Sequence, residues 1–463
     1  MAHFSKSSKN AIPLIPLTSN KLTGWYKKQK KAVQTWVSST RYKALPGETC
    51  LIPSDDGKLA MVLVGVSNYA DIWDCGNLSN DLPEGVYKFV HQRPKDVEKW
   101  ALGWALGAYS FYRYKKDKPA NPAKLALPKS ENLESAAEAI FLTRDLINTP
   151  ASDMGPAQLT SAARKLSKQH GAKFSVIVGN DLLKKNYPAI HAVGRAVETK
   201  DQAPRLIDFV WGKRTAPKVT LVGKGVCFDT GGLDLKSAAG MKLMKKDMGG
   251  AANVLGLAHM IMAAKLPLRL RVLIPAVENS ISGNALRPLD VVASRNGKTI
   301  EIGNTDAEGR VILADALAEA STEEPDLIID FATLTGAARV ALGTELPALF
   351  TNDDNFSDAV TKAGVAEQDP LWRLPLWQGY HPMITGKTAD LTNAPEGGYA
   401  GAITAALFLQ EFVKPHGSTK AIPKWAHIDL MAWNLSAKPG RPEGGEAMAI
   451  RSIFKTLSDK YIS

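Results

Sequence analysis

The sequence predicts an α/β protein of two domains: a small α/β domain at the N-terminus and a larger C-terminal domain with a mostly parallel or mixed central sheet flanked by helices. The chain has 463 residues, enough to form two or three domains. Beyond about residue 200, short apolar runs alternate with longer helical patterns, which is typical of strands joined by crossover helices. A proline-rich stretch near residue 120 separates the two parts.

The first domain is expected to span residues 1–128. Residues 60–66 (AMVLVGV) are continuously apolar, as in a buried strand. Residues 100–109 fit a helix with a close-packed face, because small residues alternate there with Trp and Leu. Both patterns indicate a small packed domain, but none of its residues forms a motif that carries chemistry.

A linker and a connecting helix are expected next. Prolines at positions 119, 122 and 128 break the chain close to several lysines. Helical spacing with good helix formers then covers about residues 131–149, where Thr149-Pro150 ends it.

The second domain is expected to span residues 129–463. Its strand candidates are the apolar runs 206–210, 219–222, 271–274, 326–330 and 426–430, and helix candidates include 251–264 and 310–320. Ligand sites of parallel sheets gather beyond the carboxyl ends of the strands. Two of these strands lead directly into segments with charged or hydroxyl side chains, so we expect a site at this edge of the sheet.

The composition is that of an ordinary globular protein, with 45% hydrophobic and 22% charged residues. No apolar run approaches the ~20 residues that span a bilayer, which excludes a membrane protein of that type, and the short apolar run at residues 11–17 lacks the features of a signal peptide. Three cysteines without CxxC spacing are typical of reduced thiols. We therefore expect a cytoplasmic protein.

The formal net charge of +11 comes mostly from one region. Residues 1–50 hold nine Lys and Arg and one acid, whereas the remaining 413 residues hold 48 basic and 45 acidic residues. The excess is densest at Lys27–Lys31, which we call the basic segment. It is read as a solvated face. An additional role in nucleic-acid binding stays open, because the aromatic residues Trp25, Tyr26 and Trp36 lie close to it.

Two glycine-flanked segments carry most of the candidate chemistry, at residues 224–232 (KGVCFDTGG) and 304–310 (NTDAEGR). Asp306 and Glu308 are two residues apart, so they converge only if residues 304–308 are extended, which the strand pattern of residues 298–302 just before them supports. Asp229 and Asp247 precede glycines in a similar way. Four neighbouring carboxylates cannot all ionise without compensation.

Two divalent cations would supply that compensation, and oxygen ligands suit Mg, Mn or Zn. The eight histidines show no paired spacing, which argues against a histidine-based zinc site. Lys224 and Lys236 are the remaining charges here; one would ligate as a neutral amine and the other would polarise a carbonyl. The residues alone leave open which does which. They also leave open a di-metal phosphoesterase.

These residues carry a family resemblance. Residues 224–232, Lys236, residues 244–252 and especially 304–310 (NTDAEGR) resemble the leucine aminopeptidases, the di-metal cytosol aminopeptidases of family M17. Residues 326–337 and 425–429 are similar to the same family. The similarity covers roughly residues 130–463, which the resemblance identifies as a catalytic domain.

The resemblance implies two metal sites and an exopeptidase that removes N-terminal residues, leucine-like and broad, from short peptides with a free N-terminus. The exchangeable site would use Asp229, Asp306 through its side chain and carbonyl, and Glu308. The tighter site would use Lys224, Asp229, Asp247 and Glu308. The metals would be Mn²⁺ or Zn²⁺.

The resemblance also implies the catalytic groups. Lys236 would polarise the scissile carbonyl and stabilise the gem-diolate. Arg310 would hold a bicarbonate ion as general base, with the backbone of Gly309 and Leu334 nearby. The first side chain would enter an apolar pocket lined by Met244, Thr333 and Gly336. Members of the family assemble as homohexamers around an inner cavity that limits substrates to short peptides.

Residues 427–432 (HIDLMA) depart from the HxDxAG segment that many family members carry. Met431 and Ala432 replace the smaller Ala and Gly. We expect Met431, which would belong to the substrate pocket, or Trp433 to alter the shape of that pocket.

Overall fold

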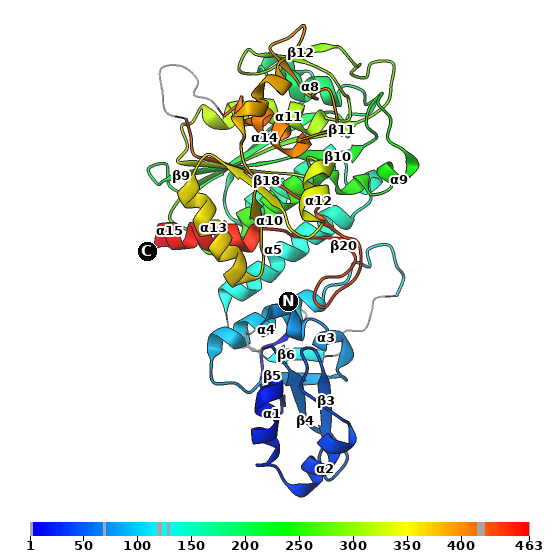
Figure 1. Ribbon diagram of the computed structural model, residues 1–463, viewed down its shortest axis with the longest axis vertical. Coiled ribbons are helices and arrows are strands. Elements are labelled where there is room, and N and C mark those ends of the chain that lie inside the picture. The colour runs from blue at the N-terminus through cyan, green and yellow to red at the C-terminus, as the bar shows by residue number, and fades with distance from the viewer. Residues whose placement is uncertain (1–2, 68–70, 118–122, 127–129, 414–421, 463) are drawn as a thin grey trace. The chain divides into compact units, whose positions relative to one another are not determined.

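The computed structural model describes residues 3–67, 71–117, 123–126, 130–413 and 422–462. It divides into two compact units, one of residues 1–141 with 435–443 and one of residues 142–434 with 444–463 (Figure 1). The expected α/β architecture with a smaller N-terminal and a larger C-terminal part is confirmed. The prolines at 119, 122 and 128 lie outside the described residues, and a domain boundary at residue 128 stays a prediction.

The first unit is built on a six-stranded sheet in the order β1-β6-β5-β2-β4-β3, in which every pair is parallel except β3–β4. Residues 60–66 fall largely in strand β4, and residues 100–109 fall largely in helix α4, as expected. The elements of this unit are β1 (Phe4–Ser5), β2 (Ile12–Leu17), α1 (Ser19–Tyr26), α2 (Lys31–Ser39), β3 (Thr49–Pro53), β4 (Leu59–Gly65), η1 (Ile72–Cys75), α3 (Leu78–Asp81), β5 (Gly85–Phe89), α4 (Pro94–Gly107) and β6 (Ala123–Ala126).

The connecting helix α5 (Glu131–Asn148) continues from the first unit into the second. The first half of the second unit contains η2 (Ala151–Asp153), α6 (Pro156–Gln169), β7 (Lys173–Val178), α7 (Asp181–Lys184), α8 (Pro188–Gly194), β8 (Arg205–Trp211), β9 (Lys218–Gly223), β10 (Gly225–Asp229), α9 (Ala238–Met241), η3 (Met244–Met248), α10 (Gly249–Ala263) and β11 (Arg269–Asn279).

The second half contains β12 (Val291–Ala293), β13 (Thr299–Glu301), α11 (Glu308–Ser321), β14 (Leu327–Ala332), α12 (Gly336–Leu342), β15 (Ala348–Thr351), α13 (Asp354–Glu367), β16 (Trp372–Arg373), η4 (Gln378–Ile384), β17 (Leu391–Thr392), α14 (Gly401–Gln410), β18 (Trp425–Asp429), β19 (Trp433–Asn434), β20 (Gly444–Gly445) and α15 (Ile450–Ile462).

The large sheet of the second unit runs in the order β16-β15-β18-β14-β9-β11-β8-β7, with β10 paired to β11. Its centre, β18-β14-β9-β11, is parallel. Strands β15, β8 and β7 pair antiparallel to their inner neighbours, so the sheet is mixed at its edges. Strands β9 and β14 are buried along almost their whole length, as central parallel strands covered on both faces must be.

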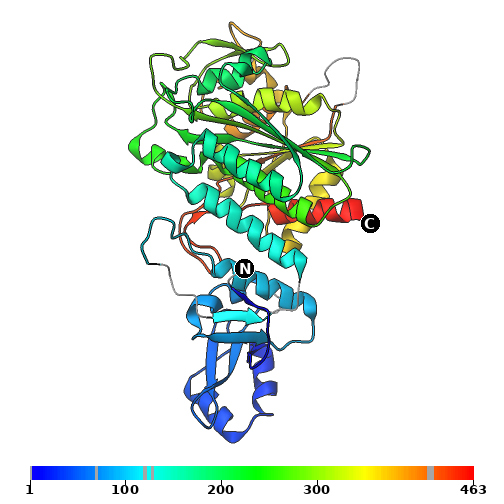
Figure 2. The same ribbon diagram turned by 180° about the vertical axis from the view of Figure 1, so that it is seen from behind.

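Helices cover both faces of this sheet (Figures 1 and 2). Helices α8, α11 and α14 lie on one face, and α10, α13 and α15 lie on the other. Helix α10 has no polar face: residues 249–262 are all buried, which suits a helix enclosed between a sheet and a second layer of helices. Several predicted site residues end or follow strands of this sheet: Lys224 follows β9, Asp229 ends β10, and Thr333 follows β14.

Candidate metal centre

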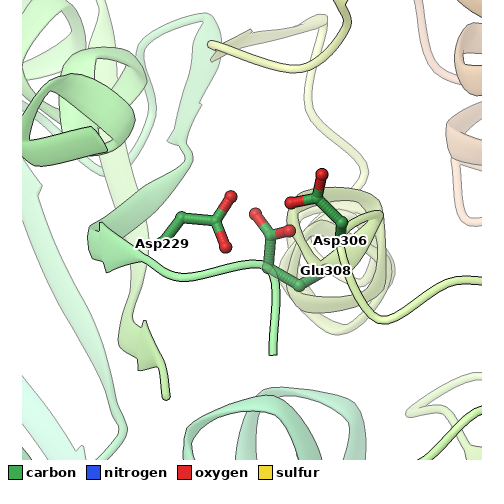
Figure 3. A group of neighbouring side chains, drawn as sticks. All are labelled: Asp229, Asp306 and Glu308. Carbon is green, nitrogen blue, oxygen red and sulfur yellow. The ribbon is translucent and has the colours of Figure 1, made fainter. Parts of the chain in front are cut away.

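The predicted acidic residues come together at the carboxyl edge of the large sheet. Asp229 is the last residue of β10, Asp247 lies in η3, and Glu308 is the first residue of α11. One carboxylate oxygen from each of Asp229, Asp306 and Glu308 lies within 4.8 Å of the others (Figure 3). Asp229 and Glu308 are buried, whereas Asp306 is partly exposed, so the cluster has one open side.

The stretch from Asn304 to Glu308 is a turn, so the expectation that it is extended is wrong. The Asn304 side-chain oxygen accepts a hydrogen bond from the Asp306 N–H at 2.7 Å, and the Asn304 carbonyl accepts from the Ala307 N–H at 3.2 Å. Asn favours such turns because its side chain reaches its own backbone two residues on. The helix then begins at Glu308, two residues earlier than expected, and the turn itself makes Asp306 and Glu308 converge.

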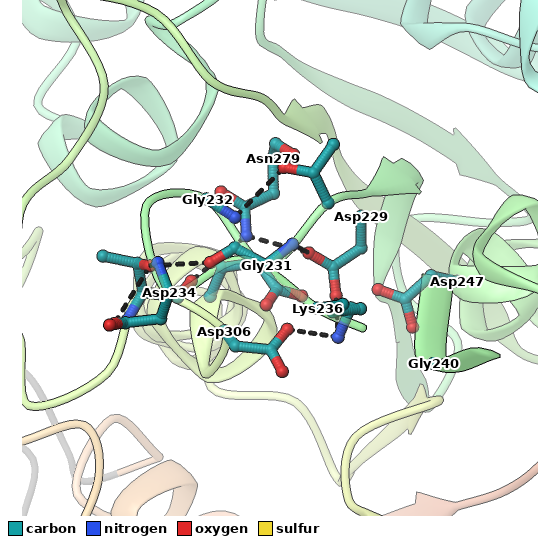
Figure 4. Close-up of polar contacts among 12 residues, drawn as sticks. Asp229, Gly231, Gly232, Asp234, Lys236, Gly240, Asp247, Asn279 and Asp306 are labelled. Atoms are coloured by element: carbon teal, nitrogen blue, oxygen red, sulfur yellow. Dashed lines mark hydrogen bonds and ion pairs between the residues drawn. The ribbon is translucent and has the colours of Figure 1, made fainter. Parts of the chain in front are cut away.

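The two acidic loops are held together by hydrogen bonds of Thr305, Asn279 and Asp234 (Figure 4). The Thr305 N–H donates to Asp234 at 2.7 Å, the Asp234 N–H donates to the Thr305 hydroxyl at 2.8 Å, and that hydroxyl donates to the Gly231 carbonyl at 2.6 Å. Asn279 donates to Asp229 at 2.8 Å and to the Thr305 carbonyl at 3.1 Å. Asp234 and Asn279 were not predicted, and Thr305 lies inside the recognised segment 304–310 without having been assigned a role.

Two lysines are placed among the carboxylates. Lys224 Nζ lies 2.9 Å from an oxygen of Asp247 and 2.9 Å from an oxygen of Glu308, and it donates to the Thr333 carbonyl. Burial alone would lower the pKa of Lys224, but the neighbouring carboxylates outweigh burial and raise it. Lys236 Nζ lies 2.8 Å from Asp229 and also pairs with Asp306, and its pKa is raised for the same reasons.

Gly309 is required by the position of Lys224. A Cβ atom at Gly309 would lie 2.6 Å from both Cε and Nζ of that lysine, which is inside van der Waals contact. The glycine of the NTDAEGR segment therefore makes room for a buried cation, and the lysine can reach the carboxylates only because this residue has no side chain.

The positive charges of the two lysines do not balance the negative charges of the neighbouring carboxylates. Burial, and then the charge of Asp229, raise the pKa of Glu308 to about 8 and that of Asp306 to about 6. Lys224 pairs with one carboxylate oxygen of Glu308, and the other, Oε2, is buried without a hydrogen-bond partner. Carboxylate oxygens with a nearby amine form a donor set that suits divalent cations. The residues present therefore fit bound metal ions.

Arg310 lies buried behind Glu308. It donates to the Asn393 carbonyl at 2.6 Å, and its Nε is buried without a hydrogen-bond partner. Burial lowers the pKa of Arg310 to about 10, against the opposing charges of Glu308 and Asp429. The Leu334 N–H, expected near an anion, donates to Asp429 at 3.0 Å. Asp429 thus fixes the loop that follows β14.

The predicted pocket residues come from three segments. Met244 begins η3, Thr333 and Gly336 lie in and after the loop that follows β14, and Met431 follows β18. The segments meet closely: a Cβ atom at Gly249 would lie 2.3 Å from Ala432 Cβ and 3.1 Å from Thr333 Cγ2. Ala432, which stands at the glycine position of the HxDxAG pattern, adopts a φ of 56°.

Comparison with known proteins decides the family. A model of the cytosol aminopeptidase family, catalytic domain, matches residues 141–454, and a model of the M17 aminopeptidase N-terminal domain matches residues 12–128. The chain belongs to the cytosol aminopeptidase family. It is a metal-dependent exopeptidase, a hydrolase that removes residues from the N-terminus of peptides, and members of this family depend on two metal ions.

Individual relatives agree. A probable cytosol aminopeptidase of Roseiflexus castenholzii is 40% identical over 377 residues, which cover 77% of this chain and 75% of the relative. The crystal structure of a cytosol aminopeptidase from Coxiella burnetii is 51% identical, with a TM-score of 0.95 over 100% of both chains. The bottromycin maturation enzyme BotP in complex with Mn is 31% identical, with a TM-score of 0.85 over 97% of this chain and 99% of BotP.

No helix in the described part of the chain is both long and apolar enough to cross a membrane.

Proposed function

We propose that this aminopeptidase removes leucine-like and other N-terminal residues from short peptides, using two divalent cations, Mn²⁺ or Zn²⁺, bound at the candidate metal centre. The observation that carries the proposal is the largely buried cluster of Asp229, Asp306 and Glu308, in which one carboxylate oxygen of each lies within 4.8 Å of the others. Buried carboxylates this close require compensating positive charge. A bound metal complex in BotP supports Mn²⁺ as one candidate.

The ligands divide into two sets. The exchangeable site consists of Asp229, Asp306 and Glu308, and Asp306 contributes its backbone carbonyl as well as its side chain. This site is the exchangeable one because Asp306 is partly exposed. Lys224, Asp247, Asp229 and Glu308 form the tighter site. The 2.9 Å distances from Lys224 Nζ to Asp247 and Glu308 support this grouping. Lys224 ligates as a neutral amine, and the metal then supplies the positive charge among these carboxylates.

When bound, the cations supply a water activated for attack and an anchor for the substrate α-amine. Lys236 reaches the open side of the cluster, where it polarises the scissile carbonyl and stabilises the oxyanion that forms from it. Arg310 holds a bicarbonate ion as the general base. Gly309 belongs to the first turn of α11, whose N–H groups favour an anion; the backbone of Leu334 lies nearby, with its N–H bonded to Asp429.

The test is hydrolysis of aminoacyl amides and unblocked dipeptides by metal-stripped protein to which Mn²⁺, Zn²⁺, Co²⁺ or Mg²⁺ is restored. N-acetylated forms of the same peptides serve as controls. Cleavage that needs both a metal and a free amine supports the proposal and ranks the preference for the first residue. Cleavage of a phosphate ester in place of any peptide would support the di-metal phosphoesterase instead.

We also propose that the enzyme is a homohexamer of the cytoplasm. The three cysteines are free and buried, which suits a reducing compartment. A hexamer with an inner cavity would restrict the active sites to short peptides. Light scattering on the protein as it elutes from a size-exclusion column measures the mass of the assembly directly. A mass of one or two chains would contradict the hexamer.

A second proposal concerns the basic segment. Lys27, Lys28, Lys30 and Lys31 are all exposed, and Trp36 is 43% exposed. This combination suits a nucleic-acid backbone with a stacking platform. The affinity for duplex or single-stranded DNA should fall steeply with salt and should be lost when the four lysines become Gln. No binding at low salt would remove this proposal and would leave the segment as a solvated face.

A further inference from the structure

Asp429 is a buried acid that the proposed reaction does not use. It is the last residue of β18 and is only 2% exposed. Strand β18 pairs in parallel with β14, where Asp429 lies opposite Ala332, and the Leu430 N–H donates to the Ala332 carbonyl at 3.0 Å. This pairing fixes the end of β14 on one side, directly before Thr333.

Three donor groups of the loop after β14 converge on the Asp429 carboxylate. Its Oδ1 accepts from the Leu334 N–H at 3.0 Å, and its Oδ2 accepts from the Thr335 hydroxyl at 2.6 Å. The Thr335 N–H is shared between the two oxygens, at 3.2 Å and 3.1 Å. Hydrogen bonds to an ionised group are stronger than those between neutral groups. Asp429 therefore fixes the backbone of residues 334 and 335.

Thr333 lies between these two fixed points and contacts two residues assigned to the tighter metal site. Its carbonyl accepts from Lys224 Nζ at 3.2 Å, and its hydroxyl donates to an oxygen of Asp247 at 2.7 Å. Thr333 is 3% exposed, so water does not compete for these bonds. Lys224 Nζ also lies 2.9 Å from both Asp247 and Glu308. A displaced Thr333 would therefore displace several groups of the metal centre together.

We propose that Asp429 is a positioning residue of the metal centre. Through the loop of residues 333–335 it sets the places of Lys224 and Asp247, and with them the affinity of the tighter site for its divalent cation. The inference rests on the ligand assignment proposed above. Groups that hold metal ligands in place typically contribute a factor of about 10–100 to metal affinity.

The substitution Asp429→Asn tests this role with almost no change in shape. A carboxylate has two acceptor oxygens, whereas an amide has one acceptor oxygen and one donor NH₂ group. In one orientation the NH₂ group would meet the Leu334 N–H, and in the other it would meet the Thr335 N–H. The variant thus keeps the volume of the side chain and loses the acceptor pattern that fixes the loop.

Asp369→Asn is the matched control. Asp369 is 7% exposed, and its carboxylate accepts from the N–H groups of Ala449 at 2.9 Å and Arg451 at 2.8 Å. It is thus a buried acid that fixes backbone N–H groups in the same way, but these groups belong to the start of α15 and to no residue assigned to the metal centre. The control separates a general loss of stability from an effect on the metal centre.

The experiment measures the dissociation constants of Mn²⁺ from the metal-stripped full chain by competition with a chelator. Asp429→Asn should raise the tighter of the two constants by about 10–100-fold, whereas Asp369→Asn should leave it at the wild-type value. Both variants should lower Tm, because each leaves buried N–H groups poorly paired. Saturating Mn²⁺ should restore most of the kcat of Asp429→Asn on Leu-Gly, because this role acts on metal affinity.

The route through Thr333 has its own test. Thr333→Val removes the hydroxyl that holds Asp247 and keeps the shape of the side chain, so it should also raise the tighter dissociation constant. Combined with Asp429→Asn, it should raise that constant by less than the product of the two single effects, because both changes act along one series of contacts. A full product would mean that Asp429 acts by another route and would overturn the proposal.

A second pair of variants decides if Asp429→Asn does not fold. Thr335→Val removes only the 2.6 Å hydrogen bond to Asp429, and Thr335→Ser keeps the hydroxyl. The Val variant should bind Mn²⁺ more weakly than the Ser variant, and equal affinities would overturn the proposal.

The remaining outcomes distinguish this inference from the proposed function. If the wild-type chain binds no Mn²⁺ and cleaves no peptide with restored metal, the proposed function fails. If the wild type binds Mn²⁺ and a folded Asp429→Asn variant keeps its affinity, only the positioning role fails. An equal rise of the dissociation constant in Asp369→Asn would show a general loss of stability and would likewise overturn that role.

Discussion

The basic segment and the metal centre both concentrate charge, but they place it in opposite surroundings. The four lysines of Lys27–Lys31 are exposed, where water solvates each of them and mutual repulsion is screened. Lys224 and Glu308 are only 3% and 1% exposed, and their charges depend on one another. The formal charge of +11 is dominated by the first region, whereas the chemistry belongs to the second. Burial of charge is therefore the better guide to function here.

The largest expected effect follows from removing one charge of the metal centre. Glu308→Ala should remove metal from the protein and abolish peptide hydrolysis. Lys236→Ala should lower kcat by about 10²–10³, as for other groups that stabilise an oxyanion. Metal analysis by mass spectrometry and kcat on Leu-Gly measure both effects, and circular dichroism checks the fold. Glu134→Ala, at an exposed position, is the control; near-normal turnover of either site variant would refute the assignment.

The contrast between exposed and buried charges also predicts that disrupting a buried ion pair outside the metal centre lowers the stability of the fold. Arg144 in α5 is fully buried and makes two 2.9 Å hydrogen bonds to the carboxylate of Glu446. Arg144→Met should cost about 3–5 kcal/mol of unfolding free energy, because the buried carboxylate of Glu446 would lose its cationic partner. Urea unfolding measures this cost. The double variant Arg144→Met with Glu446→Leu should recover much of it, and failure to recover would show that the pair is needed for packing.

A substitution of Gly309 tests the close approach of the Lys224 side chain to this residue in the metal centre. Gly309→Ala would press its Cβ against Lys224 at 2.6 Å, so we expect a loss of about 1–3 kcal/mol in stability and weaker metal retention during dialysis. Gly283→Ala is the matched control, because nothing lies within 4 Å of its Cβ position. If both variants bind metal like the wild type, Lys224 can move aside and is not fixed by this contact.

The sequence predicted the charged part of the site and little of what holds it. Residues 224–232 and 304–310 could be found because acids among glycines beside apolar strands are unusual. The turn at Asn304 was missed because its side chain competes with the extended backbone by a local hydrogen bond. The sequence gives no charge signal for the supporting residues Thr305, Asn279 and Asn393. Only their hydrogen bonds in the structure reveal that they hold the site.

The fold shows the same division. Alternating strands and helices predicted the parallel centre of the large sheet, but the pairing direction of β7, β8 and β15 depends on chain reversals that an apolar pattern does not encode. The burial of Lys246 escaped prediction for a related reason. A lysine in a sequence is usually a surface residue, and only tertiary packing reveals that this one is buried.

The smallest expected effect returns to the basic segment. Changing Lys27, Lys28, Lys30 and Lys31 to Gln should alter the unfolding free energy by less than about 0.5 kcal/mol, because exposed charges without buried partners contribute little to stability. Urea unfolding at low and high salt measures the change. A loss comparable to that of Arg144→Met would mean that these lysines are structural, and the contrast between a solvated and a buried set of charges would then fail.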